Sequence, residues 1–253
     1  MVRDRLSVAA YQAPALKYEF PLGDPSRSYA IAKRAIDVLV AATGLLLMLP
    51  LLVVISLAVL TDGRPIFFRQ IRLGEQGRPF TLTKFRTMRA GANPYARKPG
   101  VRDERVTAVG KVLRRTGLDE IPQLWNVLKG EMSLVGPRPE MPFIADSYDW
   151  VARLRLHAPP GITGLWQLSP VRLQPIHDHV EYDLFFLAHR SLLFDLWIIV
   201  RTPLVLFFGR HIVLDRGLVE RWGHKYRIER PAHRVVLDLS QPVATLADVA
   251  GPA

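Results

Sequence analysis

Two adjacent carboxylates, Asp119 and Glu120, stand where the sequence predicts the start of a helix, because Pro122 follows them and proline is tolerated in a first helical turn. Such a pair ordinarily caps a helix or interacts with its dipole. Here Arg114 and Arg115 lie a few residues upstream, so carboxylates, guanidinium groups and free helix amides could share one site with an anion. Such a site would hold a pyrophosphate while Asp119 attacks it, which gives an acyl phosphate.

A divalent cation is expected at such a site, because phosphate oxygens need neutralising charge. Mg²⁺ prefers carboxylate oxygens, so Asp119 and Glu120 are the predicted metal ligands. The cluster of His177, Asp178 and His179 is a weaker candidate, since it lacks a pair of histidines at helical metal-binding spacing. The sequence has no P-loop, and its lack of cysteine excludes a thiolate nucleophile and thiolate metal ligands.

The charge of the chain is strongly basic and concentrated in one block. The 253 residues include 34 Lys and Arg against 23 Asp and Glu, which gives a formal charge of +11. Residues 61–115 contain 14 basic and 4 acidic residues, so +10 of this excess lies there. No helix-turn-helix, zinc-finger or RNA-binding motif accompanies the block, so nucleic acid is not an expected partner. A solvated face, anionic lipid and a phosphorylated substrate remain as explanations.

An uncharged apolar stretch of 23 residues, from 38 to 60, directly precedes the basic block. Its length suffices to cross a hydrocarbon core of about 30 Å. However, basic residues flank both of its ends, whereas a spanning helix normally has one basic flank, and Pro50 divides it into two short halves. These features favour a re-entrant hairpin over a spanning helix, with a buried helix of a soluble core as the remaining alternative. Thr43 is the expected partner of the carbonyl freed near Leu46.

The periodicity of the remaining sequence predicts a coarse order of elements. These are a β-hairpin (66–72 and 80–86), a loop (91–100), two helices (106–115 and 122–129, the second ending at Gly130), a turn (160–164) and a long helix on a membrane surface (180–208).

Four motifs then make the sequence recognisable. KFRTM (84–88), LDEIPQ (118–123), SLVGPRP (133–139) and PGITG (160–164) occur in an order that resembles the bacterial sugar transferases, which are monotopic phosphoglycosyl transferases. The resemblance extends from about Lys33 to Thr202. It implies an α+β, mostly helical fold, in which a re-entrant helical hairpin broken at Pro50 precedes a cytoplasmic catalytic domain with a small β-hairpin and interfacial helices.

The resemblance also implies a reaction. A sugar-1-phosphate would pass from a UDP-sugar to undecaprenyl phosphate with release of UMP, which initiates the synthesis of exopolysaccharide or another glycoconjugate. Asp119 would be the nucleophile that forms a covalent phospho-sugar intermediate, and Glu120 would help to hold Mg²⁺. The basic residues in matching motifs would bind phosphate, with a structural ion pair as the alternative for each: Lys84, Arg86, Arg114 and Arg138.

One departure from the family pattern follows Trp166 and Gln167, where the family usually has a Gly-Arg pair and this chain has Leu168 and Ser169. Arg172 is the candidate replacement for the missing arginine. The departure is the only support for an alternative function, a catalytically inactive scaffold or regulator of a polysaccharide export complex. The sugar is expected to be a hexose such as glucose or galactose, by analogy with relatives that initiate exopolysaccharide synthesis.

The domain organisation and the partners follow from the same resemblance. The expected segments are an irregular N-terminal arm (1–28), a membrane hairpin (29–62), a catalytic domain (63–208) and a C-terminal extension (209–253). The expected partners are a UDP-sugar, undecaprenyl phosphate and membrane lipid, with a homodimer left open. The expected location is the bacterial inner membrane, with the catalytic domain on its cytoplasmic face.

Overall fold

The computed structural model describes residues 25–89, 91–92 and 103–208, together with residues 217, 219 and 221. Most of the expected N-terminal arm, the C-terminal extension and the loop at 91–100 therefore lie outside the described residues. The α-helices are α1 (Arg27–Leu47), α2 (Leu49–Leu60), α3 (Ala108–Thr116), α4 (Gln123–Lys129), α5 (Pro142–Ala145), α6 (Trp150–Arg153), α7 (Glu181–Ala188) and α8 (Leu192–Phe208). The strands are β1 (Phe67–Leu73), β2 (Pro79–Phe85), β3 (Ser133–Val135) and β4 (Gly161–Thr163).

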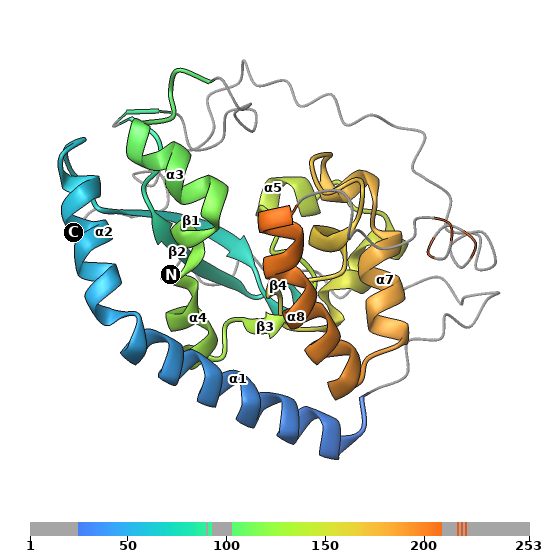
Figure 1. Cartoon of the computed structure of the whole chain (residues 1–253). Coiled ribbons are helices and arrows are strands. Elements are labelled where there is room, and N and C mark those ends of the chain that lie inside the picture. The colour runs from blue at the N-terminus through green and yellow to red at the C-terminus, as the bar shows by residue number, and fades with distance from the viewer. Residues whose placement is uncertain are drawn as a thin grey trace, which may run out of the picture.

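The protein is α+β and mostly helical, as predicted. Figure 1 shows α1 running along one side of the domain, beneath α4 and β3, and α2 turning up beside α3. Helix α1 begins at Arg27, close to the expected boundary between the arm and the following segment, and the division into these segments stays a prediction. The side chain of Ser26 caps this helix by accepting a hydrogen bond from the Tyr29 amide at 3.2 Å.

The apolar stretch is a bent helix pair. Among the described residues, no single helix has both the length and the hydropathy to cross a membrane, but α1 and α2 together do, and they are bent by 63°. Pro50 lies in the first turn of α2, where its missing N–H costs nothing. The prediction that Thr43 bonds the carbonyl near Leu46 is wrong. The backbone amide of Met48 donates to the carbonyls of Gly44 and Leu46 instead.

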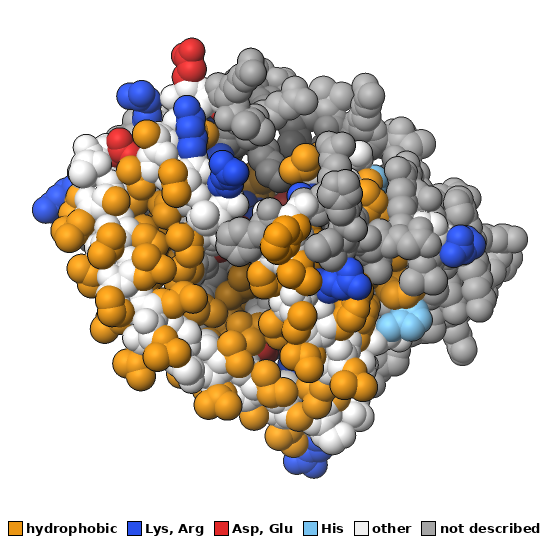
Figure 2. Space-filling view, viewed as in Figure 1, with side chains coloured by type: hydrophobic (Ala, Val, Ile, Leu, Met, Phe, Trp, Pro, Cys, Tyr) orange, Lys and Arg blue, Asp and Glu red, His pale blue; other side chains and the backbone are white. Residues whose placement is uncertain are grey.

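The outer face of the bent pair α1–α2 is apolar. Figure 2 shows hydrophobic side chains covering the surface formed by α1 and α2. Leu39 and Leu47 on α1 are 67% and 74% exposed, and Val54 on α2 is 62% exposed. The opposite face packs inward, where Ala41 on α1 and Val59 on α2 are 0% and 1% exposed. The bent helix pair therefore presents one face to the domain and leaves an apolar face exposed.

The predicted β-hairpin is confirmed. Strands β1 and β2 pair antiparallel, with Phe67 opposite Phe85 and Arg72 opposite Phe80. Alternation in β2 puts Phe80 and Leu82 on one face, in one core cluster, whereas Phe85 lies on the opposite face and packs in a second cluster with Ile55 and Val59 of α2. The two predicted helices are also confirmed, as α3 and α4, and Gly130 ends α4 with a φ of 82°.

The predicted turn at 160–164 is wrong, because Gly161–Thr163 forms strand β4. This strand pairs in parallel with β3, in the register Ser133 to Gly161 and Val135 to Thr163. The glycines permit close approach of two backbones rather than reversal of one chain, since a Cβ on Gly161 would overlap the backbone of Gly136.

The predicted single helix at 180–208 is wrong as well. The structure has two helices, and Ser191 begins the second by accepting a hydrogen bond from the Phe194 amide at 3.2 Å. Helix α7 is not on the surface: Tyr182, Leu184 and Phe186 are at most 2% exposed and belong to the largest hydrophobic core. Of these two helices, only α8 has exposed apolar side chains, including Leu193, which is 81% exposed.

Candidate active site

The dyad of Asp119 and Glu120 lies in a short 3-10 turn, η2 (Leu118–Glu120), between α3 and α4. Gly117, with a φ of 73°, ends α3 and redirects the chain into this turn. Of the amides expected beside the dyad, those of Glu120 and Ile121 are engaged, because they donate to the carbonyls of Gly117 and Leu118.

The Asp119 carboxylate is buried and held without a hydrogen bond. Asp119 is 7% exposed, and no described residue forms a hydrogen bond or ion pair with its side chain. Burial raises the pKa of Asp119, and the neighbouring charge of Glu120 raises it further. The cationic side chains of Lys84, Arg114 and Arg138 oppose this effect. A desolvated carboxylate next to cations is a good nucleophile when ionised.

Three cations converge on the dyad from separate elements. Lys84 comes from β2, Arg114 from the last turn of α3, and Arg138 from the loop after β3. The Arg138 guanidinium lies 3.0 Å from a Glu120 carboxylate oxygen, and the Arg114 Nε atom donates to the Thr87 hydroxyl at 2.7 Å.

Lys84 is the most perturbed of the three. Burial lowers the pKa of its ammonium group to about 8, against the opposing attraction of Asp119 and Glu120. Arg138 shows the reverse effect, since the charge of Glu120 raises its pKa. The structure thus brings together five of the predicted site residues.

The remaining predicted arginines lie elsewhere. Arg86 is buried and donates to the carbonyls of Val59 and Gly63, at the end of α2. Arg115 is exposed at the end of α3. Arg172 donates to the Val205 carbonyl of α8 at 3.4 Å. Among the described residues, no contact joins Arg86, Arg115 or Arg172 to the dyad. Arg86 and Arg172 bond backbone carbonyls instead, and the phosphate-binding roles of all three arginines stay predictions.

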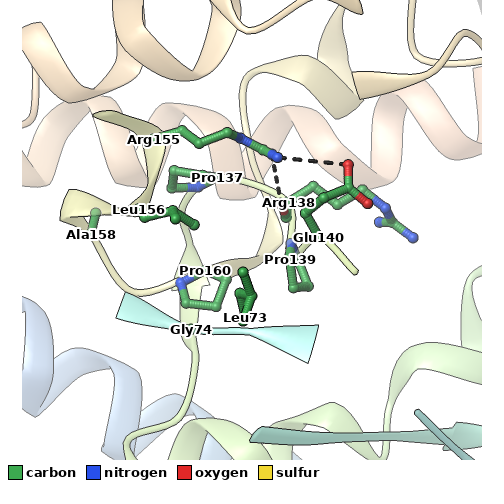
Figure 3. A pocket seen from close by; sticks show the side chains of 10 residues that line it. All are labelled: Leu73, Gly74, Pro137, Arg138, Pro139, Glu140, Arg155, Leu156, Ala158 and Pro160. Atoms are coloured by element: carbon green, nitrogen blue, oxygen red, sulfur yellow. Dashed lines mark hydrogen bonds and ion pairs between the residues drawn. The ribbon is translucent and has the colours of Figure 1, made fainter. Parts of the chain in front are cut away.

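A buried polar cluster behind Arg138 was not predicted. Arg155, 1% exposed, donates to the Arg138 carbonyl at 2.7 Å and to Asp183 at 2.8 Å. Its guanidinium also bonds the Tyr148 hydroxyl at 2.6 Å and lies 3.8 Å from Glu140. Figure 3 shows Arg155 reaching across a small pocket to the loop that carries Arg138. This cluster fixes the backbone that presents the Arg138 side chain.

The donor set of the dyad fits Mg²⁺ that arrives with a phosphorylated substrate. Mg²⁺ in proteins is commonly held by one or two carboxylates plus substrate phosphates and water. Asp119 provides a buried carboxylate free of hydrogen bonds to the described residues, and Glu120 lies next to it. No group of three or more His, Asp or Glu suited to a metal occurs in the described part of the chain, so a dedicated metal cage is not found there.

Comparison with known proteins identifies a family whose model covers the segment that contains these residues. A family model described as "Bacterial sugar transferase" matches residues 28–209. The exopolysaccharide production protein ExoY of Rhizobium meliloti is 39% identical over 189 residues, which cover 68% of this chain and 84% of that protein.

Two further relatives carry the name UDP-glucose:undecaprenyl-phosphate glucose-1-phosphate transferase. The protein from Caulobacter vibrioides is 39% identical over 190 residues, covering 70% of each chain. The protein from Escherichia coli is 40% identical over 195 residues, covering 73% of this chain and 41% of its own length. The match thus includes every element that positions the dyad.

Proposed function

The chain belongs to the bacterial sugar transferase family, and from that membership we propose that it transfers a sugar-1-phosphate from a UDP-sugar to undecaprenyl phosphate and releases UMP. It is an enzyme of the phosphoglycosyl transferase type. The observation that carries the proposal is the buried Asp119 carboxylate, surrounded by Glu120 and three cations. The names of the relatives also support a role in exopolysaccharide production.

In the first half-reaction, an Asp119 carboxylate oxygen attacks the phosphorus that carries the sugar. The bond from this phosphorus to the bridging oxygen breaks, and UMP leaves with the electron pair. Lys84, Arg114 and Arg138 neutralise the charge that builds up on the phosphate oxygens. Mg²⁺, when bound, supplies additional positive charge to these oxygens.

In the second half-reaction, a phosphate oxygen of undecaprenyl phosphate attacks the same phosphorus and restores the Asp119 carboxylate. The lipid acceptor requires the site to lie at a membrane. The exposed apolar face of α1 and α2 supports a re-entrant anchor in the bacterial inner membrane, with the domain on the cytoplasmic side (Figure 2). Membrane lipid is thus part of the proposal, whereas a homodimer stays a prediction.

The function is tested by incubating the purified protein with undecaprenyl phosphate, Mg²⁺ and each of a panel of UDP-sugars, while UMP is measured. UDP-glucose and UDP-galactose are the first two candidates. We expect UMP release with at least one sugar and a matching lipid-linked product. If no common UDP-sugar yields UMP, the enzymatic proposal is wrong and the alternative of an inactive scaffold gains support.

Removal of divalent cations is expected to abolish UMP release, because two carboxylates and a diphosphate cannot approach one another without neutralising charge. The measurement is the rate of UMP release in EDTA. Restoration of the rate by excess Mg²⁺ in the same sample controls for damage by the chelator. An equal rate with and without EDTA would contradict the predicted role of Mg²⁺.

The rate at alkaline pH is expected to fall as Lys84 loses its proton. Because burial lowers the pKa of Lys84 to about 8, its charge is present below this pH and is lost above it. The value of kcat/KM for the UDP-sugar reports the free enzyme and should decline above about pH 8. On the acid side, the raised pKa of Asp119 makes the rate fall at a higher pH than an ordinary aspartate would.

The variant Lys84→Arg tests whether deprotonation of Lys84, and not of another group, causes the alkaline decline of the rate. Arginine stays charged to above about pH 12, so the alkaline decline should disappear or move to higher pH. Lys111→Arg, at an exposed position on α3, is the matched control and should keep the wild-type profile. An unchanged alkaline limb in Lys84→Arg would assign the titration to another group.

A further inference from the structure

We propose that Arg34 and Asp37, one turn apart on α1, are positioning residues that hold both sides of the Glu120–Arg138 ion pair in register. The hairpin is then part of the framework of the active site as well as its anchor. This inference rests on the proposed function for its kinetic consequences. Its structural basis is independent of the reaction.

Arg34 holds the side of the site that carries the dyad. Its guanidinium donates to the carbonyls of Val127 at 2.7 Å and Leu128 at 2.9 Å. These carbonyls lie in the last turn of α4, where the end of a helix favours positive charge, and the Val127 carbonyl also accepts from the Gly130 amide at 3.0 Å. Helix α4 follows η2 almost directly, so a shift of α4 along α1 moves Glu120 with it.

Helix α4 is also tied to the strand of Lys84. Its Asn126 side chain accepts from the Thr83 amide at 3.3 Å and donates to the Thr81 carbonyl at 2.8 Å. Arg34 therefore fixes a unit that includes both the dyad and one of the cations around it.

Asp37 holds the opposite side of the site. One of its carboxylate oxygens accepts a hydrogen bond from the Leu134 amide at 3.0 Å, in a buried position. Leu134 is in β3, which leads directly into the loop that carries Arg138. Asp37 is 4% exposed although it lies in a helix whose other face is apolar and exposed.

The two residues belong to one stripe of α1 that faces the domain. Ala41 and Gly44 continue the stripe at helical spacing: Ala41 is fully buried, and a Cβ on Gly44 would lie 3.3 Å from Leu124 of α4. Small residues thus allow close packing, and the two polar residues set where along α1 each partner lies. Neither Arg34 nor Asp37 has a described contact with the dyad, so each acts through the backbone that it holds.

The test compares four purified variants in lipid nanodiscs. Arg34→Gln and Asp37→Ala remove the bonds to α4 and β3. Asp37→Asn retains an oxygen that can accept the Leu134 amide. Arg27→Gln removes the same charge from an exposed position of α1 and is the matched control for Arg34→Gln.

We expect kcat for UMP release to fall by about 10-fold or more in Arg34→Gln and Asp37→Ala, with a smaller change in KM, because reacting groups are displaced rather than removed. Amide hydrogen exchange should increase in residues 117–123 for Arg34→Gln and in residues 133–138 for Asp37→Ala. Asp37→Asn and Arg27→Gln should keep kcat and amide hydrogen exchange near their wild-type values. All four variants should remain bound to lipid.

Wild-type kcat and wild-type exchange in Arg34→Gln and Asp37→Ala would overturn the inference. So would equal losses in Asp37→Asn and Asp37→Ala, because the carboxylate charge rather than the hydrogen bond would then matter. If Asp37→Ala does not fold, Arg34→Gln at its half-buried position decides the question. If the wild-type protein releases no UMP from any sugar, the proposed function fails, while the exchange measurements still test the positioning role.

Discussion

Replacement of Asp119 by Asn is expected to reduce UMP release by at least about 10³-fold, because a neutral amide cannot form the acyl phosphate. The same variant should accumulate no phospho-sugar adduct when it is incubated with the UDP-sugar alone. Mass spectrometry of the intact protein measures the adduct directly. In the wild-type protein the adduct should appear without the lipid acceptor and disappear when undecaprenyl phosphate is added.

Two further variants make this result specific. Asp146→Asn removes a carboxylate from an exposed position and should leave both UMP release and the adduct unchanged. Glu120→Gln retains the nucleophile and should slow the reaction while still forming some adduct. An adduct that persists in Asp119→Asn but is lost in Glu120→Gln would make Glu120 the nucleophile.

Replacement of Arg155 by Met is expected to destabilise the protein by about 3–5 kcal/mol, because it leaves the buried Asp183 carboxylate without its counter-charge. Arg155 bonds Asp183 and lies near Glu140, and both carboxylates are at most 4% exposed. The melting temperature should fall by roughly 6 °C or more, as measured by intrinsic fluorescence in detergent. UMP release should fall too, since the Arg138 carbonyl loses its donor.

The matched control for this variant is Arg153→Met. Arg153 is half-buried, and its Nε atom donates to the Tyr148 carbonyl at 3.2 Å without a buried carboxylate partner. The double variant Arg155→Met/Asp183→Leu should recover only part of the loss, because the Tyr148 hydroxyl and the Arg138 carbonyl still lose their bonds to Arg155. A melting temperature within about 2 °C of wild type for Arg155→Met would contradict the proposed importance of the cluster.

Local features of the fold were predictable because local sequence determines them. Alternation between Phe80 and Phe85 predicts a strand, and Gly130 predicts the end of α4. The predictions of secondary structure are wrong where the same residue type is compatible with two different local structures. Gly161 permits a tight turn or a close pair of strands, and the choice depends on Gly136, far away in sequence. Likewise, Ser191 within an apolar run gives no strong sign that it begins a new helix.

The site was predictable only in part, because it too depends on residues that are far apart in the sequence. Motifs identify Asp119, Glu120 and the nearby cations, but not which cations reach the dyad. Arg138 pairs with Glu120 across 18 positions of sequence, and Arg155 reaches Asp183 across 28 positions. No spacing rule relates such distant residues. The signal available in the sequence was the occurrence of charged residues, such as Asp183, within otherwise apolar segments that had to be buried.

The inward stripe of α1 has a consequence for how this protein can evolve. Because Arg34 and Asp37 bond both sides of the candidate site, we expect that the pair α1–α2 and the domain cannot be exchanged as separate modules. The family match of residues 28–209 runs from the start of α1 to the end of α8 and so includes both the helix pair and the candidate site. The Escherichia coli relative, of which this chain covers 41%, has its additional length outside the shared segment. Gene fusion is therefore expected at the borders of this unit and not between its anchor and its active site.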